Sequence, residues 1–262
     1  MSGDETALRL PEQTIPAPRS ISPQAQAYLA AAAKRIAEKS KGGTASLSAG
    51  NEEPSAEMAV RFLRPLAERF KGVLDTIALP NGARLYRATP EARSGRFAAV
   101  AYFDIHGGGF SAGGGEMCLA LAKIRACDLG VEVFAIDYRL APLHPFPAAL
   151  DDCVAAYSEI LGARQSSDLV VAGSSAGGNL AAALMLRARN ARLPLPAGVV
   201  LMTPALDLTC AGDTYRTNRY LDVNLYGDVE GQFAAYSGGS DLLNPICRRY
   251  SVKSVAGGRV PC

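Results

Sequence analysis

The pattern of apolar and polar positions predicts two helices before any strand. Ser22 and Pro23 supply an N-cap followed by proline at the first helical position, and residues 24–39 are rich in alanine. The second predicted helix, residues 55–71, carries a large apolar side chain at every fourth position, which places these side chains on one face. These side chains are Met58, Phe62, Leu66 and Phe70. We expect both helices to cover something, either as a cap over a site or as a packing layer.

Short apolar runs begin near residue 73 and then alternate with helical segments. The turn Pro80-Asn81-Gly82 separates the first two runs, as in a hairpin. The predicted strands are 74–79, 83–88, 96–105, 131–136, 169–172 and 197–202, and the helices between the later ones are 116–128, 147–161 and 176–191. Continuous apolar strands that alternate with helices predict an α/β fold, with a mostly parallel sheet covered by helices on both faces.

The character of the chain changes again after the last predicted strand. We divide the chain into an N-terminal arm with a helical cap (1–72), an α/β core (73–245) and a basic tail (246–262). The core includes a cap-like insertion near 205–235, which is irregular apart from one modest helical segment at 227–235. The tail contains four basic residues, no acidic residue and no clear strand or helix pattern.

Composition narrows the classes of function. The 262 residues are 48% hydrophobic and 20% charged, which is typical of a globular protein with a large core. A net charge of +2 disfavours a nucleic-acid binder or a polybasic membrane binder. No apolar run approaches the ~20 residues of a membrane span, and the opening residues lack the apolar core of a secretory signal. We therefore expect a cytoplasmic protein whose six scattered cysteines are reduced and whose two histidines form no metal site.

Residues 173–177 read Gly-Ser-Ser-Ala-Gly and match the pattern G-x-S-x-G between a predicted strand and a predicted helix. Such a turn needs small residues two positions before and after the serine, because it is tight and strained. It exposes the central hydroxyl, here that of Ser175, at the end of the sheet and directs the N-terminus of the next helix toward it. This pattern indicates a nucleophilic serine, and an ordinary glycine-rich turn is the alternative.

Residues 106–110 read His-Gly-Gly-Gly-Phe and follow another predicted strand. Three successive glycines let backbone N–H groups converge on one point, and the oxyanion of an acyl-transfer reaction requires such donors. Gly107, Gly109 and Ala112 also fit the dinucleotide pattern G-x-G-x-x-A. That alternative is weak, because Asp137 alone approximates the acid expected after the next strand and the serine motif would remain unexplained.

Three segments together resemble the hormone-sensitive-lipase-like family of α/β-hydrolase esterases. They are the HGGGF loop at 106–110, the stretch 137–152 that begins Asp-Tyr-Arg-Leu-Ala-Pro, and the GSSAGGNLA sequence at 173–181, which occur in the family's order and spacing. The resemblance covers roughly residues 20–245. It implies an α/β-hydrolase fold, a substrate that is a short-chain carboxylic ester, a small lactone or an acetylated compound, and no metal or organic cofactor.

The resemblance also assigns roles to residues. It implies Ser175 as the nucleophile, and backbone N–H groups around the oxyanion from Gly107, Gly108, Gly109 and Ala176. We interpret His106 as a residue that orients the glycine loop rather than as a base. Asp137 and Arg139 are expected to support the site through ion pairs and not to act on substrate.

The rest of a serine hydrolase triad is missing from this chain. In this fold the acid and then the histidine follow the serine, and the histidine takes the serine proton. His106 and His144 both precede Ser175, and no acid after Ser175 follows a further strand and helix unit. We therefore expect an ester hydrolase with impaired activity. The alternative is a small-molecule binder on the same scaffold.

The basic tail suggests a reason for the missing residues. Family resemblance continues through residue 245, and the last two strand and helix units are absent. We hypothesise a truncation in which a shifted reading frame produces residues 246–262. The strand around 199–201 would then be an exposed apolar edge that favours aggregation or partner pairing. The alternative is a naturally short chain whose missing edge another subunit supplies, as in a homo-oligomer.

Overall fold

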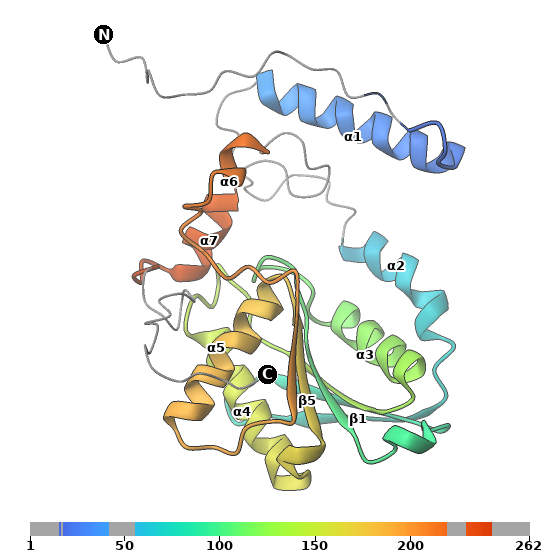
Figure 1. Cartoon of the computed structure of the whole chain (residues 1–262), viewed down its shortest axis with the longest axis vertical. Helices are drawn as coiled ribbons and strands as arrows, with labels where there is room; N and C mark the ends of the chain where they lie inside the picture. Colours follow the sequence, from blue (N-terminus) through green and yellow to red (C-terminus); the bar gives the residue numbers. More distant parts are fainter. Residues whose placement is uncertain (1–15, 17, 42–55, 219–228, 243–262) are drawn as a thin grey trace, which may run out of the picture. The chain divides into compact units, whose positions relative to one another are not determined.

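The computed structural model describes residues 16, 18–41, 56–218 and 229–242 (Figure 1). The chain divides into two compact units. One consists of residues 1–45 with 214–227, and the other of residues 46–213 with 228–262. The predicted division at residues 72, 205–235 and 245 stays a prediction, and the basic tail lies outside the described residues.

The smaller unit contains the helices α1 (Pro23–Lys41) and α6 (Thr214–Thr217). Helix α1 begins where the sequence predicts, since the Ser22 hydroxyl accepts a hydrogen bond from the Ala25 N–H at 3.2 Å. Ala32 of α1 is fully buried.

The larger unit is built on a six-stranded sheet with the order β1-β2-β4-β3-β5-β6. The strands are β1 (Gly72–Ala78), β2 (Arg84–Pro90), β3 (Ala101–Ile105), β4 (Glu132–Asp137), β5 (Leu169–Ser174) and β6 (Gly198–Met202). Strands β1 and β2 form the predicted hairpin, and β2 is also antiparallel to β4. The other four strands are parallel, so the mostly parallel sheet is confirmed.

Helices cover both faces of the sheet (Figure 1). Helix α3 (Glu116–Leu129) packs against β2 and β4 on one face, and α2 (Ala56–Ala67) packs on α3. Helices α4 (Ala148–Ala163) and α5 (Ala176–Asn190) contact each other on the other face. The direction of each crossover explains this division, because β3 leads to one side of the sheet and β4 and β5 lead to the other, and crossovers are right-handed.

Three short helices complete the described part of this unit. They are the 3₁₀ helices η1 (Gly95–Phe97) and η2 (Ser166–Asp168) and the α-helix α7 (Val229–Ser237). Helix α7 matches the modest helical segment predicted at 227–235.

The core lies around the central parallel strands. Phe103, Ile105, Ile136 and Val171 are fully buried, as the continuous apolar runs predict for strands that are covered on both faces. Burial of these side chains removes apolar surface from water and supplies the main favourable free energy of folding.

Helix α2 buries a different face from the one that its sequence predicts. Phe62 is 79% exposed and Leu66 is 41% exposed, so the predicted stripe does not face the core, although Phe70 packs against it. The side of α2 that is shielded from solvent carries Val60, Leu63 and the buried Ala67. The spacing of apolar residues alone does not fix this choice, because it depends on where α3 offers space for small side chains.

Strand β6 ends the described sheet. It pairs with β5 on one side, and no strand among the described residues pairs with its other side. Val199 and Val200 are 40% and 44% exposed. The predicted exposed apolar edge is therefore present in the part of the chain that the structure describes.

Candidate active site

Ser175 lies at the turn between β5 and α5, where the motif predicts it. Its backbone has φ +52° and ψ −118°, a left-handed conformation that is uncommon for a residue with a side chain. The Ser175 N–H donates to the carbonyl of Met202 at 2.9 Å, and the Ser175 carbonyl accepts from the Ala205 N–H at 3.1 Å. The end of β6 and the residues after it therefore hold the turn in this conformation.

The glycines of the motif are required by close backbone contacts. A Cβ on Gly173 would collide with the carbonyl of Gly177, and a Cβ on Gly177 would collide with the carbonyls of Ile105 and His106. A Cβ on Gly178 would lie 2.7 Å from the Pro204 side chain. The strand β5, the helix α5 and the end of β3 can therefore meet at Ser175 only because these positions lack side chains.

The glycine loop after β3 lies directly against the serine. A Cβ on Gly107 would lie 3.4 Å from the Cβ of Ser175. Gly108 has φ +113° and Gly109 has φ +58°, and the Gly108 carbonyl accepts hydrogen bonds from the N–H groups of Ser111 and Ala112. Two motifs are thus brought together although Phe110, the last residue of one, precedes Gly173, the first residue of the other, by 63 positions.

Ala176 is buried and follows Ser175 as the first residue of α5. Its N–H belongs to the first turn of the helix, where backbone donors have no partner within the helix and the helix dipole favours negative charge. The first turn of α5 and the glycine loop therefore both lie next to Ser175. Backbone donors that converge on one point can stabilise a developing oxyanion.

His106 is fixed to the glycine loop. Its Nδ1 lies 2.7 Å from the Gly107 carbonyl, and its ring stacks on that of Tyr138 with the centroids 4.1 Å apart. The Tyr138 hydroxyl donates to the His106 carbonyl at 3.0 Å. Burial lowers the pKa of His106 and favours the neutral imidazole. The role of His106 in orienting the glycine loop stays a prediction.

Asp137 and Arg139, whose supporting role stays a prediction, take part in two separate sets of contacts. Asp137 accepts hydrogen bonds from the Gly115 N–H at 2.8 Å and the Tyr86 hydroxyl at 3.2 Å, and it forms an ion pair with Arg84 at 2.8 Å. It therefore secures the end of the glycine-rich loop where α3 begins. The Tyr86 hydroxyl has its pKa raised to about 12 by burial and by the Asp137 charge, so it remains a donor.

Arg139 instead pairs with the fully buried Asp152 of α4, with Nη2 2.8 Å from Oδ1. The Arg139 N–H and the Asn81 amide donate to the same carboxylate, at 2.8 Å and 2.6 Å. These bonds join α4, the loop after β4 and the β1–β2 turn. Such contacts position backbone and do not reach the serine.

Helix α7 covers the glycine loop, a contact that sequence reasoning missed. The ring of Phe110 stacks on Tyr236 with a centroid distance of 3.7 Å and meets Phe233 edge to face at 6.3 Å. The Gln232 carboxamide lies against Gly109, since a Cβ on that glycine would lie 3.0 Å from its Oε1. The spacing of Phe233 and Tyr236 places both rings on one face of a helix and so indicates packing. It does not identify Phe110 as the residue that they contact.

Within the residues that the structure describes, no group of three or more His, Cys, Asp or Glu side chains is placed to hold a metal ion. Among the same residues, no helix is both long and apolar enough to cross a bilayer.

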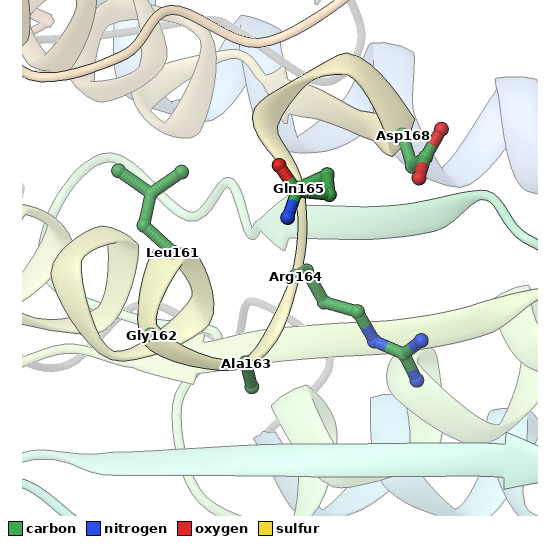
Figure 2. A pocket seen from close by; sticks show the side chains of 6 residues that line it. All are labelled: Leu161, Gly162, Ala163, Arg164, Gln165 and Asp168. Carbon is green, nitrogen blue, oxygen red and sulfur yellow. The ribbon is translucent and has the colours of Figure 1, made fainter.

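A cavity of about 290 Å³ lies at the other end of β5, beyond its first residue (Figure 2). Its lining includes Gln165, Asp168 and Arg164, whose guanidinium forms an ion pair with the buried Glu132. Because β5 separates this cavity from Ser175, it takes no part in the arrangement around the serine.

Comparisons with known proteins agree with this geometry. The family described as having an α/β hydrolase fold matches residues 102–259. An esterase of Acinetobacter venetianus is 38% identical over 124 residues, which cover 47% of this chain and 41% of the relative. The hormone-sensitive lipase of Mus musculus is 36% identical over 174 residues, which cover 63% of this chain and 22% of the relative.

Two solved structures extend the likeness. The crystal structure of an esterase E25 matches with a TM-score of 0.74 and 25% identity, and the match covers 93% of this chain and 76% of that one. A hormone-sensitive-lipase homologue, EstE7, from a metagenome library matches with a TM-score of 0.60 and 34% identity, over 73% of this chain and 68% of that one.

The chain spans less than half the length of the two curated relatives described above. The matched family range nevertheless includes the glycine loop, Ser175 and most of the sheet. The chain therefore belongs to the α/β-hydrolase family, among the esterases that resemble hormone-sensitive lipase.

Proposed function

We propose that this chain hydrolyses short-chain carboxylic esters or small lactones by acyl transfer to Ser175, at a rate limited by the lack of a triad histidine. The observation that supports this most strongly is the approach of Gly107 to the Cβ of Ser175, which brings the glycine loop to the serine.

In the proposed reaction, the Ser175 oxygen attacks the ester carbonyl carbon and the carbonyl oxygen becomes an oxyanion. Backbone N–H groups of Gly107, Gly108, Gly109 and Ala176 are the proposed donors to that oxygen. The C–O bond to the alcohol then breaks, and the alcohol leaves with a proton. Water hydrolyses the acyl-serine, which releases the carboxylic acid and restores the hydroxyl group.

Proton transfer is the difficult step in this chain. A serine hydroxyl is a weak nucleophile unless a base removes its proton. Both histidines precede Ser175, and the His106 ring is bonded and stacked within the glycine loop. The proton therefore passes to solvent. Oxyanion donors and substrate binding alone leave about 10³–10⁴-fold catalysis over water in hydrolases without a triad.

A non-catalytic small-molecule binder on the same scaffold is the second candidate. The observation in its favour is that no histidine follows Ser175 in the sequence. A binder would hold a small molecule beside the glycine loop and show no chemistry that depends on the Ser175 hydroxyl.

Hydrolysis of p-nitrophenyl acetate and butyrate distinguishes the two candidates. We expect slow turnover that falls at least about tenfold in Ser175→Ala, whereas Ser174→Ala, next to it in β5, keeps most of the activity. Circular dichroism should show that all three proteins are folded. Added imidazole should supply the missing base and accelerate the wild type beyond the Ser175→Ala control. Equal rates for wild type and Ser175→Ala, with and without imidazole, would favour the binder.

The proposal includes the partners and the location. The proposed partner is a small ester or lactone, and a net charge of +2 disfavours a nucleic acid. No metal or organic cofactor takes part in the proposed reaction. We place the protein in the cytoplasm, and we propose that copies associate through the exposed edge of β6 to form a homo-oligomer.

A further inference from the structure

Helix α7 carries one polar side chain to the glycine loop. A Cβ on Gly109 would lie 3.0 Å from Oε1 and 3.6 Å from Nε2 of Gln232. The Gln232 side chain is only partly exposed. Its carboxamide therefore occupies the side of Gly109 where other residues would have their Cβ.

Packing of the residues that follow Gln232 fixes the position of α7. Phe233, the next residue, meets the Phe110 ring edge to face, and Tyr236 stacks on that ring. The Phe146 N–H donates to the Tyr236 carbonyl at 2.7 Å. The ring contacts attach α7 to Phe110 in the glycine loop, so the helix cannot move away from the loop without disrupting a buried aromatic cluster.

The Gln232 carboxamide has hydrogen-bonding capacity that the described residues do not use. Among them, its side chain makes no hydrogen bond. A carboxamide offers two N–H donors and a carbonyl acceptor, and a half turn about its last bond exchanges the positions of Oε1 and Nε2. A donor that is partly shielded from water and already positioned gains more from binding a charged oxygen than a mobile surface donor does.

We propose that Gln232 is a side-chain donor to the substrate, in which Nε2–H bonds the carbonyl oxygen of the ester beside the backbone donors of the glycine loop. This inference rests on the proposed function, because it assumes that an ester carbonyl occupies the space next to Gly109 and Ser175. The bond strengthens as that oxygen gains negative charge, so it lowers the barrier to acyl transfer more than it tightens substrate binding.

Two substitutions at position 232 test the donor. Gln232→Leu keeps much of the side-chain volume without any polar atom, and Gln232→Glu keeps the shape but at neutral pH can only accept hydrogen bonds. We expect both to lower kcat for p-nitrophenyl butyrate by about 10- to 100-fold, with KM changed much less. The exposed Glu230 on the same helix provides the control, and Glu230→Gln should leave kcat unchanged. Wild-type kcat in Gln232→Leu, with an unchanged melting temperature, would overturn the proposal.

Butyrate binding gives a readout that does not require the serine to react. A carboxylate oxygen of this product presents negative charge where the oxyanion would form. In a Ser175→Ala background, we expect Gln232→Leu to weaken butyrate binding about fivefold or more in calorimetric titration. Equal affinity, or no binding to either protein, overturns the role of Gln232. Weaker binding together with hydrolysis that is independent of Ser175 would instead retain the donor and reject the proposed function.

Discussion

Three glycines near Ser175 lie where neighbouring segments approach too closely for a side chain; they are Gly173, Gly177 and Gly178. Gly177 shows this most clearly, because its Cα faces the carbonyls of Ile105 and His106 at the end of β3. The serine turn and the end of β3, where the glycine loop begins, are therefore packed directly against each other. A substitution in either segment should affect both stability and activity.

Substitution of Gly177 by alanine tests this coupling. The added Cβ must displace the end of β3, so we expect the free energy of unfolding to fall by ~2–4 kcal/mol. We also expect any Ser175-dependent hydrolysis to be lost. Gly162 in α4 is the matched control, since a Cβ there meets no atom within 4 Å. Gly162→Ala should stabilise the protein by about 0.5–1 kcal/mol. Chemical denaturation measures the free energy of unfolding of both variants. Equal changes in Gly177→Ala and Gly162→Ala would contradict the coupling between the serine turn and the end of β3.

At the scale of elements, local sequence predicts the motifs better than their surroundings. The segments 106–110 and 173–177 could be found because tight turns need glycine at fixed positions. The contact of α7 with Phe110 could not be found in this way, because it joins segments more than 100 residues apart. The buried face of α2 was mispredicted for a similar reason, since its position against α3 and not its own periodicity decides that Phe62 faces solvent.

The contact between α7 and the glycine loop can be weakened at Tyr236, which is 1% exposed. Tyr236→Ala removes the ring that stacks on Phe110 and should lower the free energy of unfolding by ~3–5 kcal/mol. We expect hydrolysis to fall as well, because the loop loses the packing that positions its donors. Phe97→Ala in η1, at a ring that is 48% exposed, should change thermal stability little. A Tyr236→Ala protein with native stability and kcat would refute this role of α7.

Among the described residues, the buried acid Asp104 carries a charge that opposes folding. Burial raises the pKa of Asp104 in β3 from its ordinary value of 3.8 to about 6, although Arg125 partly offsets this. Because the folded state holds the proton more tightly than the unfolded chain, the contribution of Asp104 to stability is greatest below pH 4. It decreases between pH 4 and 6 and stays constant above that range.

Replacement of Asp104 by asparagine should remove this pH dependence. The expected gain in the free energy of unfolding at pH 7 to 8 is at most ~3 kcal/mol, from a shift of about two pH units, and it should vanish near pH 4. Thermal melts of both proteins across this pH range provide the measurement. A variant that is less stable than wild type at pH 8 would show that the charged carboxylate is stabilising.

The two outer strands of the sheet differ in how they meet solvent. Strand β6 is parallel to its neighbour and exposes Val199 and Val200, whereas β1 at the other edge belongs to a hairpin and exposes Val73. The alternation of apolar runs and helices in the sequence was sufficient to predict β6. Its place at the edge of the described sheet was predicted from the absence of later strand and helix units.

A lysine on the β6 edge should reduce association between copies. Val200→Lys places a charge on the exposed edge and should shift the protein toward the monomer in size-exclusion chromatography with light scattering. Val73→Lys on the opposite edge is the control and should leave the distribution unchanged. An identical mass distribution for wild type and Val200→Lys would exclude β6 as the site of association.

The reactivity of Ser175 is the central claim, and covalent labelling tests it most directly. A fluorophosphonate reacts when the serine oxygen forms a bond to phosphorus and fluoride leaves, with the proton passing to solvent, so the reaction needs the oxyanion donors but no acyl-enzyme turnover. Mass spectrometry of the digested protein should find one adduct, on Ser175, that forms slowly, accelerates with imidazole and disappears after denaturation. Folded protein that remains unlabelled, or that is labelled equally in Ser175→Ala, would contradict the account.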